Sequence, residues 1–498
     1  MPTYNGDEVN ALVLDVGSMW TRAGFAGEES PYAYFPTSVG YMIDSDSESS
    51  KNNKKAPEQN PTIESNNENA EKNDSMDVDT ETNKNEKSTN DSEKSDTRLK
   101  YYVGNSGISL FRPGMEVKNV LADGMVDDWD AYEKILDYAL YNQLRINPEE
   151  HPIMVSEASW NSAEKREKLT ELMFEKFKCP GFYVCKSAVL TAFGTGKSTA
   201  LVVDSGADFS SAVPVYDGYV LQKGIVRQNL GGNVISDLIV DYLKEEQNYQ
   251  ITPLFEIKRK ERVEVGKQPI FDRRDLGGIT DSFRNYMIRQ TVLEYKESVC
   301  QVLEYPYDEN TASSRGNKSF EFPDGFSLVL GSRRFYEPEV MFQPNLFFNK
   351  DRTRIGKNLE NMNTDKNDEN INGNQNMNNN TNLERKKDAH EYMSIQELAY
   401  RAVSKCDVDL RPHLLHNVVL TGGNTLFPGF TERFSNELPK LCQSSRVRIH
   451  TPGSTIDRRY TAWLGGSILA SLGTFHQMWI SSEEYQEQGT SIVNKRCF

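Results

Sequence analysis

One short pattern occurs twice in this chain, and it restricts the possible folds more than any other feature. The apolar run Leu12-Val13-Leu14 stops at Asp15-Val16-Gly17-Ser18, and the apolar run Leu201-Val202-Val203 stops at Asp204-Ser205-Gly206. Alternating apolar segments follow at residues 21–26 and 211–216. Apolar runs that end in turn residues predict buried strands, so each copy is expected to be a hairpin with an acidic residue at its tip. Two copies predict a duplicated α/β domain in which the tips face each other.

The residues at these two tips suit a phosphate group and its counter-ion. Glycine lets the backbone approach an anion closely, and aspartate can hold a hydrated divalent cation against the same phosphates. Asp-Ser-Gly is also an ordinary turn, so either copy alone is weak evidence. A third apolar strand at 418–420 ends in Gly422-Gly423 before a predicted helix at 430–441, and such a junction accepts phosphate or a flat base. The three turns together predict a nucleotide cleft. Further helices are predicted at 129–144, 164–177 and 234–246.

Composition and charge exclude several other classes of protein. Of the 498 residues 37% are hydrophobic, which is low for a wholly globular chain, and residues 44–98 contain no aromatic residue. We expect residues 44–98 and the Asn-rich residues 349–390 to be disordered, because they bury too little apolar surface to offset chain entropy. The formal net charge of −16 argues against a protein that coats nucleic acid. Six cysteines without a Cys-x-x-Cys pair favour free thiols, and the absence of a signal pattern or a membrane-length apolar run indicates a cytosolic or nuclear protein.

Longer motifs indicate a family. The segments AGFAGEESPYAYFP at 23–36, KCDVDLR at 405–411 and YTAWLGGSILASLGTFHQMWISSEEYQEQGTSIVNKRCF at 460–498 resemble actin. The opening Gly6-Asp7-Glu8-Val9 and residues 253–258 resemble the fourth class of actin-related proteins. The resemblance implies an α/β fold of the actin, Hsp70 and hexokinase type, with two duplicated lobes around a nucleotide cleft and a smaller outer subdomain on each lobe. The expected subdomains are the first at 1–36, 119–178 and 460–498, the second at 37–118, the third at 179–230 and 336–459, and the fourth at 231–335.

The resemblance also implies the ligands and the residues that bind them. It implies ATP or ADP with Mg²⁺, and it assigns Asp15 and Asp204 to the metal, acting mainly through water. On the adenosine side Phe427 stands where actin has a tyrosine and Arg459 stands where it has a lysine, and both can stack on the purine. The residues expected to bind the nucleotide are Gly17, Ser18, Arg22, Ser205, Gly206, Gly232, Gly422, Gly423, Thr425, Phe427 and Arg459.

Other departures from actin bear on ATP hydrolysis. Met19 stands where actin has a glycine, Ala207 where it has an aspartate and Asp208 where it has a glycine. In actin a glutamine and a histidine order the attacking water, and we match them to Glu171 and Ser211. A glutamine amide both donates and accepts hydrogen bonds, whereas a carboxylate beside the γ-phosphate has no donor and adds repulsion. We therefore expect bound nucleotide with slow or undetectable turnover, and no catalytic residue.

The function implied by the resemblance is that of a nuclear, non-polymerising scaffold subunit. It would belong to chromatin-remodelling and histone acetyltransferase complexes and act in transcription regulation and DNA repair. The implied partners are an actin monomer and a helicase-SANT-associated helix of a remodelling ATPase or an acetyltransferase scaffold. That helix is expected to dock in an exposed groove lined by Trp463, Phe475, Met478 and Trp479, although several of these four must also belong to the core. No membrane contact and no direct sequence-specific DNA binding are expected.

Two charged segments leave alternatives open. The acidic residues 44–98 attract basic histone tails and nucleosomes in one hypothesis, although most such runs are only solvated. They also lie where actin contacts the next filament subunit, which argues against the alternative of a polymerising actin-like ATPase. A sugar kinase or a chaperone on the same fold is disfavoured by the actin-like segment at 460–498. The basic residues 258–262 are interpreted as a solvated helix face rather than a nuclear-import signal.

Overall fold

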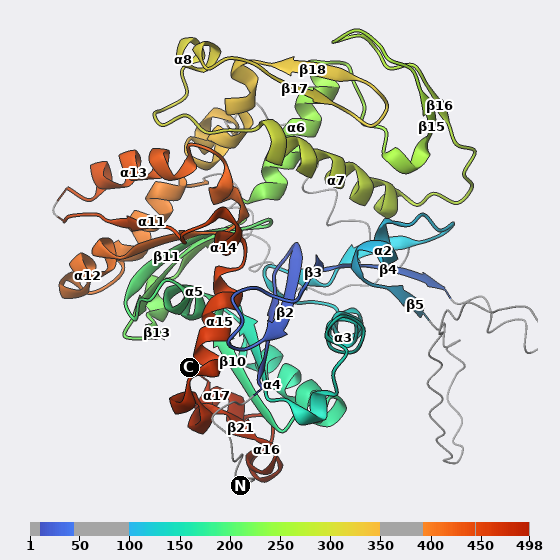
Figure 1. Cartoon of the computed structure of the whole chain (residues 1–498). Coiled ribbons are helices and arrows are strands. Elements are labelled where there is room, and N and C mark those ends of the chain that lie inside the picture. The colour runs from blue at the N-terminus through green and yellow to red at the C-terminus, as the bar shows by residue number, and fades with distance from the viewer. Residues whose placement is uncertain (1–9, 44–98, 349–391, 444, 498) are drawn as a thin grey trace, which may run out of the picture. The chain divides into compact units, whose positions relative to one another are not determined.

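The computed structural model describes residues 10–43, 99–348, 392–443 and 445–497 (Figure 1). The two expected insertions and residues 6–9 therefore lie outside the described residues. The chain divides into two compact units, of which the smaller spans residues 41–101 and the larger spans residues 1–40 and 102–498. The ends of β4 (Ser38–Ile43) and β5 (Leu99–Tyr102) belong to the smaller unit. All of the features below lie in the larger unit.

The first predicted hairpin stands in the middle of a six-stranded sheet. β1 (Leu12–Val16) pairs antiparallel with β2 (Trp20–Phe25) and parallel with β9 (Ile153–Glu157). β3 (Ala33–Pro36) continues the sheet beyond β2, whereas β10 (Gly181–Lys186) and β21 (Ile480–Ser481) continue it beyond β9. Every residue of β9 is buried, as expected for a strand covered on both faces.

The second predicted hairpin stands in the same place in a second sheet. β11 (Ala200–Ser205) pairs antiparallel with β12 (Ser210–Tyr216) and parallel with β19 (Val418–Thr421). β13 (Tyr219–Val220) and β14 (Val226–Gln228) pair with β12, and β20 (Ile449–His450) pairs with β19. The path β13-β12-β11-β19-β20 repeats the path β3-β2-β1-β9-β10 of the first sheet. The predicted fold class, a duplicated α/β fold, is confirmed.

The predicted helices are present, with differences at their ends. α3 (Trp129–Asp137) continues as the π-helix η1 (Tyr138–Leu144), and α4 (Ala163–Glu171) continues as the π-helix η3 (Leu172–Lys176). Ser162 caps α4, since its Oγ accepts a hydrogen bond from the Lys165 N–H at 3.3 Å. α6 (Gly232–Glu245) and α13 (Phe430–Leu441) lie where they were predicted.

Two closely packed helices connect the sheets. α5 (Ser187–Gly194) contacts β9 and β10 of the first sheet and β11, β12 and β19 of the second, and α15 (Thr461–Ser471) packs on β1 and on α5. Glycines permit this approach. A Cβ at Gly465 would overlap the Leu190 carbonyl oxygen, and one at Gly194 would lie 2.7 Å from the Thr461 carbonyl oxygen. Larger residues at either position would push the two helices apart.

The remaining elements surround these sheets. α11 (Ile395–Ser404) and α12 (Arg411–His416) pack on β11 and β12, and α13 packs on α11. α7 (Asp281–Val299) contacts α6 and β17 (Lys318–Glu321), which pairs with β18 (Ser327–Leu330). Further short elements are β6 (Glu116–Asn119), β7 (Leu121–Ala122), β8 (Met125–Val126), η11 (Gly423–Leu426) and α14 (Thr455–Arg459).

Two sequence interpretations were wrong. The basic residues 258–262 do not form a helix face, because β15 (Ile257–Lys260) is a strand that pairs with β16 (Phe271–Arg273). Three of the four residues expected to line an exposed C-terminal groove are buried. Trp463 is fully buried and donates its indole N–H to the Val13 carbonyl at 3.0 Å, while Phe475 and Trp479 pack edge to face at 5.2 Å. Met478 alone of the four is half-buried. Within the described ranges no helix has the length and apolarity needed to cross a membrane.

Candidate functional site

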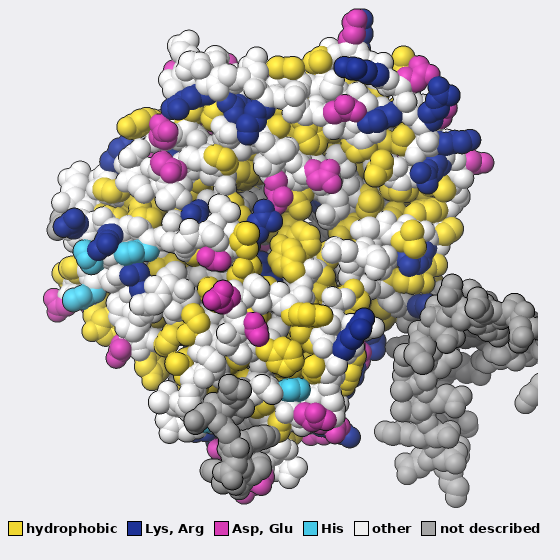
Figure 2. Space-filling model, viewed as in Figure 1, with side chains coloured by type: hydrophobic (Ala, Val, Ile, Leu, Met, Phe, Trp, Pro, Cys, Tyr) yellow, Lys and Arg dark blue, Asp and Glu magenta, His cyan; other side chains and the backbone are white. Residues whose placement is uncertain are grey.

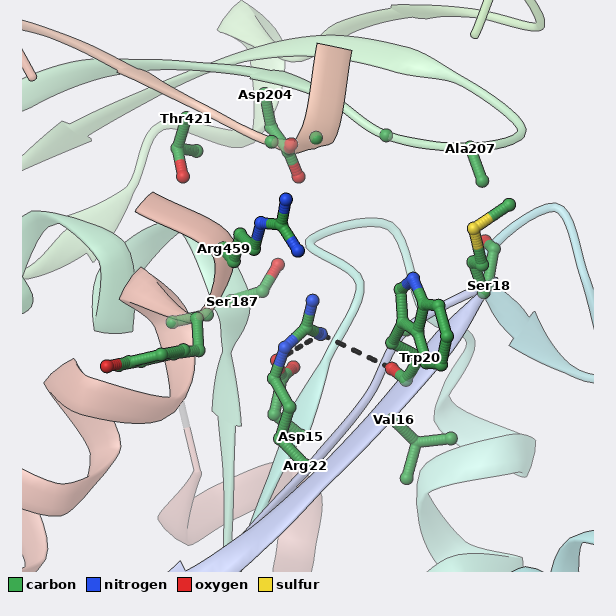
Figure 3. Close-up of a pocket in the computed structure, with 18 of the residues that line it drawn as sticks. Asp15, Val16, Ser18, Trp20, Arg22, Ser187, Asp204, Ala207, Thr421 and Arg459 are labelled. Atoms are coloured by element: carbon green, nitrogen blue, oxygen red, sulfur yellow. Dashed lines mark hydrogen bonds and ion pairs between the residues drawn. The ribbon is translucent and has the colours of Figure 1, made fainter. Parts of the chain in front are cut away.

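A cavity of about 330 Å³ lies between the tips of the two hairpins. Its lining includes the turn after β1, the turn after β11, the turn after β19 and the first residue of α6 (Figure 3). This volume falls within the range of roughly 300–1,000 Å³ that is typical of small-molecule sites. Duplication of the sheet thus brings together three turns that are far apart in the sequence.

The first turn presents a fixed carboxylate to this cavity. Asp15 accepts hydrogen bonds from Arg22 Nη1 at 3.0 Å and from Ser156 Oγ at 2.5 Å. The Gly17 N–H donates to the Trp20 carbonyl at 3.0 Å and closes the turn. Arg22 and Ser156 together hold the orientation of the Asp15 carboxylate, and the Arg22 guanidinium adds a positive charge to the lining.

The second turn presents a carboxylate, Asp204, whose pKa is raised. Burial and repulsion from Asp15 raise the pKa of Asp204 to about 6, and Arg22 acts in the opposite direction. Ala207 lines the cavity beside it, whereas Asp208 turns away and accepts a hydrogen bond from Asn233 Nδ2 at 2.6 Å. A buried carboxylate that is repelled by a second one is a suitable environment for a divalent cation, because the charge of the cation removes this repulsion.

The third turn is shaped by its first glycine. Gly422 has a φ of +94°, and a Cβ there would overlap Asp204 Oδ1 and the Ser205 carbonyl oxygen. Gly423 has no heavy atom within 4 Å of an added Cβ, and it therefore leaves open space at the cavity wall. Asn424 ties the turn to the second hairpin, since its Nδ2 donates to Ser205 Oγ at 3.0 Å and to the Gly206 carbonyl at 2.7 Å.

A buried lysine supports the start of α6. Lys296 Nζ, from α7, donates to the Gly232 carbonyl at 2.7 Å, and the side chain is 4% exposed. Burial lowers the pKa of Lys296 to about 8. Both Lys296 and Gly232 line the cavity, so an amine that is easily deprotonated faces the same space as the two aspartates.

The structure brings most of the predicted site residues together. Ser205 and Thr425 are exceptions, because both are buried behind the lining. Ser205 Oγ bonds to Ser210 Oγ at 2.9 Å, and Thr425 Oγ1 donates to the Gly422 carbonyl at 2.7 Å. These hydroxyls support the turns rather than face the cavity. The predicted residues that line the cavity are Asp15, Gly17, Ser18, Arg22, Asp204, Gly206, Gly232, Gly422, Gly423, Phe427 and Arg459.

The residue matched to the water-ordering glutamine lies elsewhere. Glu171 is exposed at the end of α4 and is absent from the cavity lining, so it has no access to a ligand there. Ser187 and Thr191 of α5 line the cavity instead. Ser211 lies behind Asp204, in the lining of a small adjoining cavity of about 40 Å³. Glu171 therefore does not stand in for the water-ordering glutamine, and this expectation was wrong, because the side chain is exposed at the end of α4.

Several residues of the lining were not predicted. Trp20 and Tyr34 come from the first hairpin and the strand beside it, and Glu297 pairs with Arg459 at 3.7 Å. A signal for Trp20 and Tyr34 was available, because large aromatic residues at half-exposed strand positions beside a phosphate-type turn are candidates for a ligand wall. Lys296 had no such signal, since a lysine within a polar helix is normally solvated.

Comparisons with known proteins agree with this architecture. The sequence model of the family described as Actin matches residues 6–498. Actin-related protein 4 of Schizosaccharomyces pombe is 35% identical, over 99% of both chains, and actin-related protein 4 of Arabidopsis thaliana is 36% identical, over 99% of this chain and 100% of its own. A further Schizosaccharomyces pombe relative, named SWI/SNF and RSC complexes subunit arp42, is 32% identical over 99% of this chain and 100% of its own.

Proposed function

The chain belongs to the actin family, and from this premise we propose that it is a nucleotide-holding, non-polymerising subunit of nuclear chromatin-remodelling and histone acetyltransferase complexes. The observation that carries the nucleotide part is the meeting of two equivalent Asp-Gly hairpin tips and a third glycine turn at one cavity. The chromatin part is supported by similarity to proteins named actin-related protein 4 and to one named as a SWI/SNF and RSC complexes subunit.

The lining fits an adenine nucleotide with Mg²⁺. Asp15 and Asp204 would hold the hydrated cation, whose charge would offset the burial and the repulsion that raise the pKa of Asp204. Ser18 and Gly206 would face the phosphates, and the open wall at Gly423 leaves room for a flat base. When bound, the cation supplies charge neutralisation for the phosphates.

The proposal includes slow or absent hydrolysis. No glutamine or histidine occurs among the described residues that line the cavity. Ser187 and Thr191 contribute hydroxyls beside Asp204, and Ala207 contributes no polar group. Hydroxyl groups can bind a water, but they are poor bases at neutral pH compared with histidine, so Ser187 and Thr191 do not replace one.

The role of the nucleotide in this proposal is structural. It binds both hairpin tips at once, and therefore stabilises the arrangement of the two sheets that contacts partners. Two apolar side chains are exposed near the C-terminal end of α15: Ile468 lies on the helix and is 40% exposed, and Leu472 is the residue that follows the helix and is 42% exposed. This pair is a better candidate contact for a partner helix than the buried aromatic residues proposed from the sequence.

Affinity purification of the tagged full-length chain from nuclear extract tests the function. We expect subunits of remodelling and acetyltransferase complexes together with actin in the purified fraction. Substitution of Ile468 and Leu472 by aspartate is expected to reduce their recovery, whereas aspartate at Val408, which is 70% exposed, is expected to leave it unchanged.

The purified chain should also remain in the supernatant under conditions that sediment filamentous actin, and it should release phosphate more slowly than monomeric actin. A partner list made of cytoskeletal proteins, or sedimentation with ATP consumption, would contradict the proposal and favour a polymerising ATPase.

A further inference from the structure

An aromatic pair stands at the edge of the cavity, beside the first turn. Trp20 begins β2, and Tyr34 lies on the neighbouring strand β3 opposite Arg22. Their rings stack with centroids 4.7 Å apart and an interplanar angle of 18°, and the Arg22 guanidinium lies 5.7 Å from the Tyr34 ring. Both rings line the cavity.

The position of the pair is unusual for a structural stack. Tyr34 is 37% exposed and Trp20 is half-buried, although each could bury far more area in a core position. The stack therefore leaves apolar ring surface open to the cavity and to solvent. Figure 2 shows hydrophobic side chains, with acidic and basic side chains close by, at the middle of this face of the molecule.

An ion pair from two other elements also lies in the cavity lining. Arg459 of α14 and Glu297 of α7 form an ion pair at 3.7 Å with side chains 45% and 57% exposed, and both line the cavity. Burial raises the pKa of Tyr34, while the charges of Arg22 and Arg459 act against the increase. The charges of Arg459 and Glu297, which come from distant parts of the chain, thus both affect the pKa of Tyr34. Trp20, Arg22 and Arg459 surround the same open space (Figure 3).

We propose that Trp20 and Tyr34 are further ligand-binding residues, which form an aromatic wall that covers the bound nucleotide opposite Arg459 and slows its release. The inference rests on the proposed nucleotide function and deepens it. The ring faces of Trp20 and Tyr34 can contact the base or the ribose of the nucleotide and exclude water from that contact. Arg459 can lie against the other side of the ligand. Release then requires the ligand to leave both surfaces, so the wall affects the dissociation rate more than the association rate.

Release of radiolabelled ATP from the full-length protein with Mg²⁺, chased with excess unlabelled ATP, tests the wall. We expect Trp20→Ala and Tyr34→Ala to release ATP about five- to tenfold faster than wild type. Alanine at position 20 keeps the backbone carbonyl that accepts from the Gly17 N–H and from Arg22 Nη1. Trp20→Phe should restore most of the slow release, and Tyr32→Ala should release ATP at the wild-type rate, because Tyr32 is 75% exposed and lies outside the lining.

The outcomes separate this inference from the function on which it rests. Wild-type release rates in both alanine variants, with ATP bound, would overturn the aromatic wall and leave the nucleotide function intact. Failure of the wild-type protein itself to retain ATP would overturn both. Should circular dichroism show that Trp20→Ala is unfolded, Tyr34→Ala decides the question, because the more exposed Tyr34 tolerates truncation better.

Discussion

At the scale of single residues, Lys296 is a buried charge in the cavity lining. Its amine donates a hydrogen bond to the Gly232 carbonyl at 2.7 Å, and this acceptor is neutral. Removal of the ammonium group from water costs more than this bond returns, and burial accordingly lowers the pKa of Lys296 to about 8. The folded state thus releases this proton at a lower pH than the unfolded chain, which keeps the ordinary lysine pKa.

This difference predicts a pH dependence of stability. Between pH 8 and 10.5 the unfolded state binds a proton that the folded state has released, so the contribution of Lys296 to stability rises with pH in this window. Tyrosines and cysteines of the unfolded chain also titrate in this pH range. The measurement is therefore the difference in unfolding free energy between wild type and Lys296→Met. We expect wild type to gain on the order of 3 kcal/mol relative to the variant from pH 7.5 to 10.5. Parallel stability profiles would contradict the prediction.

At the scale of elements, two neighbouring glycines in the turn between β19 and η11 have different roles. Gly422 is needed for folding, and Gly423 leaves space for a ligand. Gly422 must adopt a φ of +94° against Asp204, whereas its neighbour Gly423 meets no atom within 4 Å of an added Cβ. Gly422→Ala is therefore expected to destabilise the fold by about 2 kcal/mol or more, through strain and overlap.

Gly423→Ala is the matched control for Gly422→Ala. Gly423→Ala should unfold at the wild-type denaturant concentration, because its methyl group meets no protein atom. The same methyl group enters the cavity, so the variant should bind ATP more weakly. Urea unfolding and ATP titration of both variants check the pair, and equal stability of Gly422→Ala and wild type would refute the role of this turn.

The sequence predicted these turns well because local chemistry determines them. Apolar runs that stop at Asp and Gly give strand and turn without reference to the rest of the fold, and the repeat predicts the duplicated sheets. Side-chain direction was harder to predict. Glu171 points outward because α4 places it on the exposed face, and Ser205 and Thr425 point behind the lining to bond with other turns. Residues 258–260 form part of a strand because pairing with β16 outweighs their helical propensity.

At the scale of the whole molecule, the two sheets meet along α5 and α15 and at the cavity. Glycines allow the two helices to pack closely, and the hairpin tips of both sheets converge on a cavity that residues of both helices also line. A ligand that bridges the tips adds binding free energy only to the state in which both sheets are correctly placed. In the proposed function this ligand is an adenine nucleotide, and its binding stabilises the fold.

The most direct test is the nucleotide content of the full-length protein purified without added nucleotide, followed by urea unfolding before and after its removal with a chelator and apyrase. We predict close to one adenine nucleotide per chain, and a loss of unfolding free energy on its removal. Mg²⁺ and ATP at 100 times the dissociation constant should restore about 2.7 kcal/mol. Protein that contains no nucleotide, and whose unfolding is unchanged by Mg²⁺ and ATP, would contradict the account.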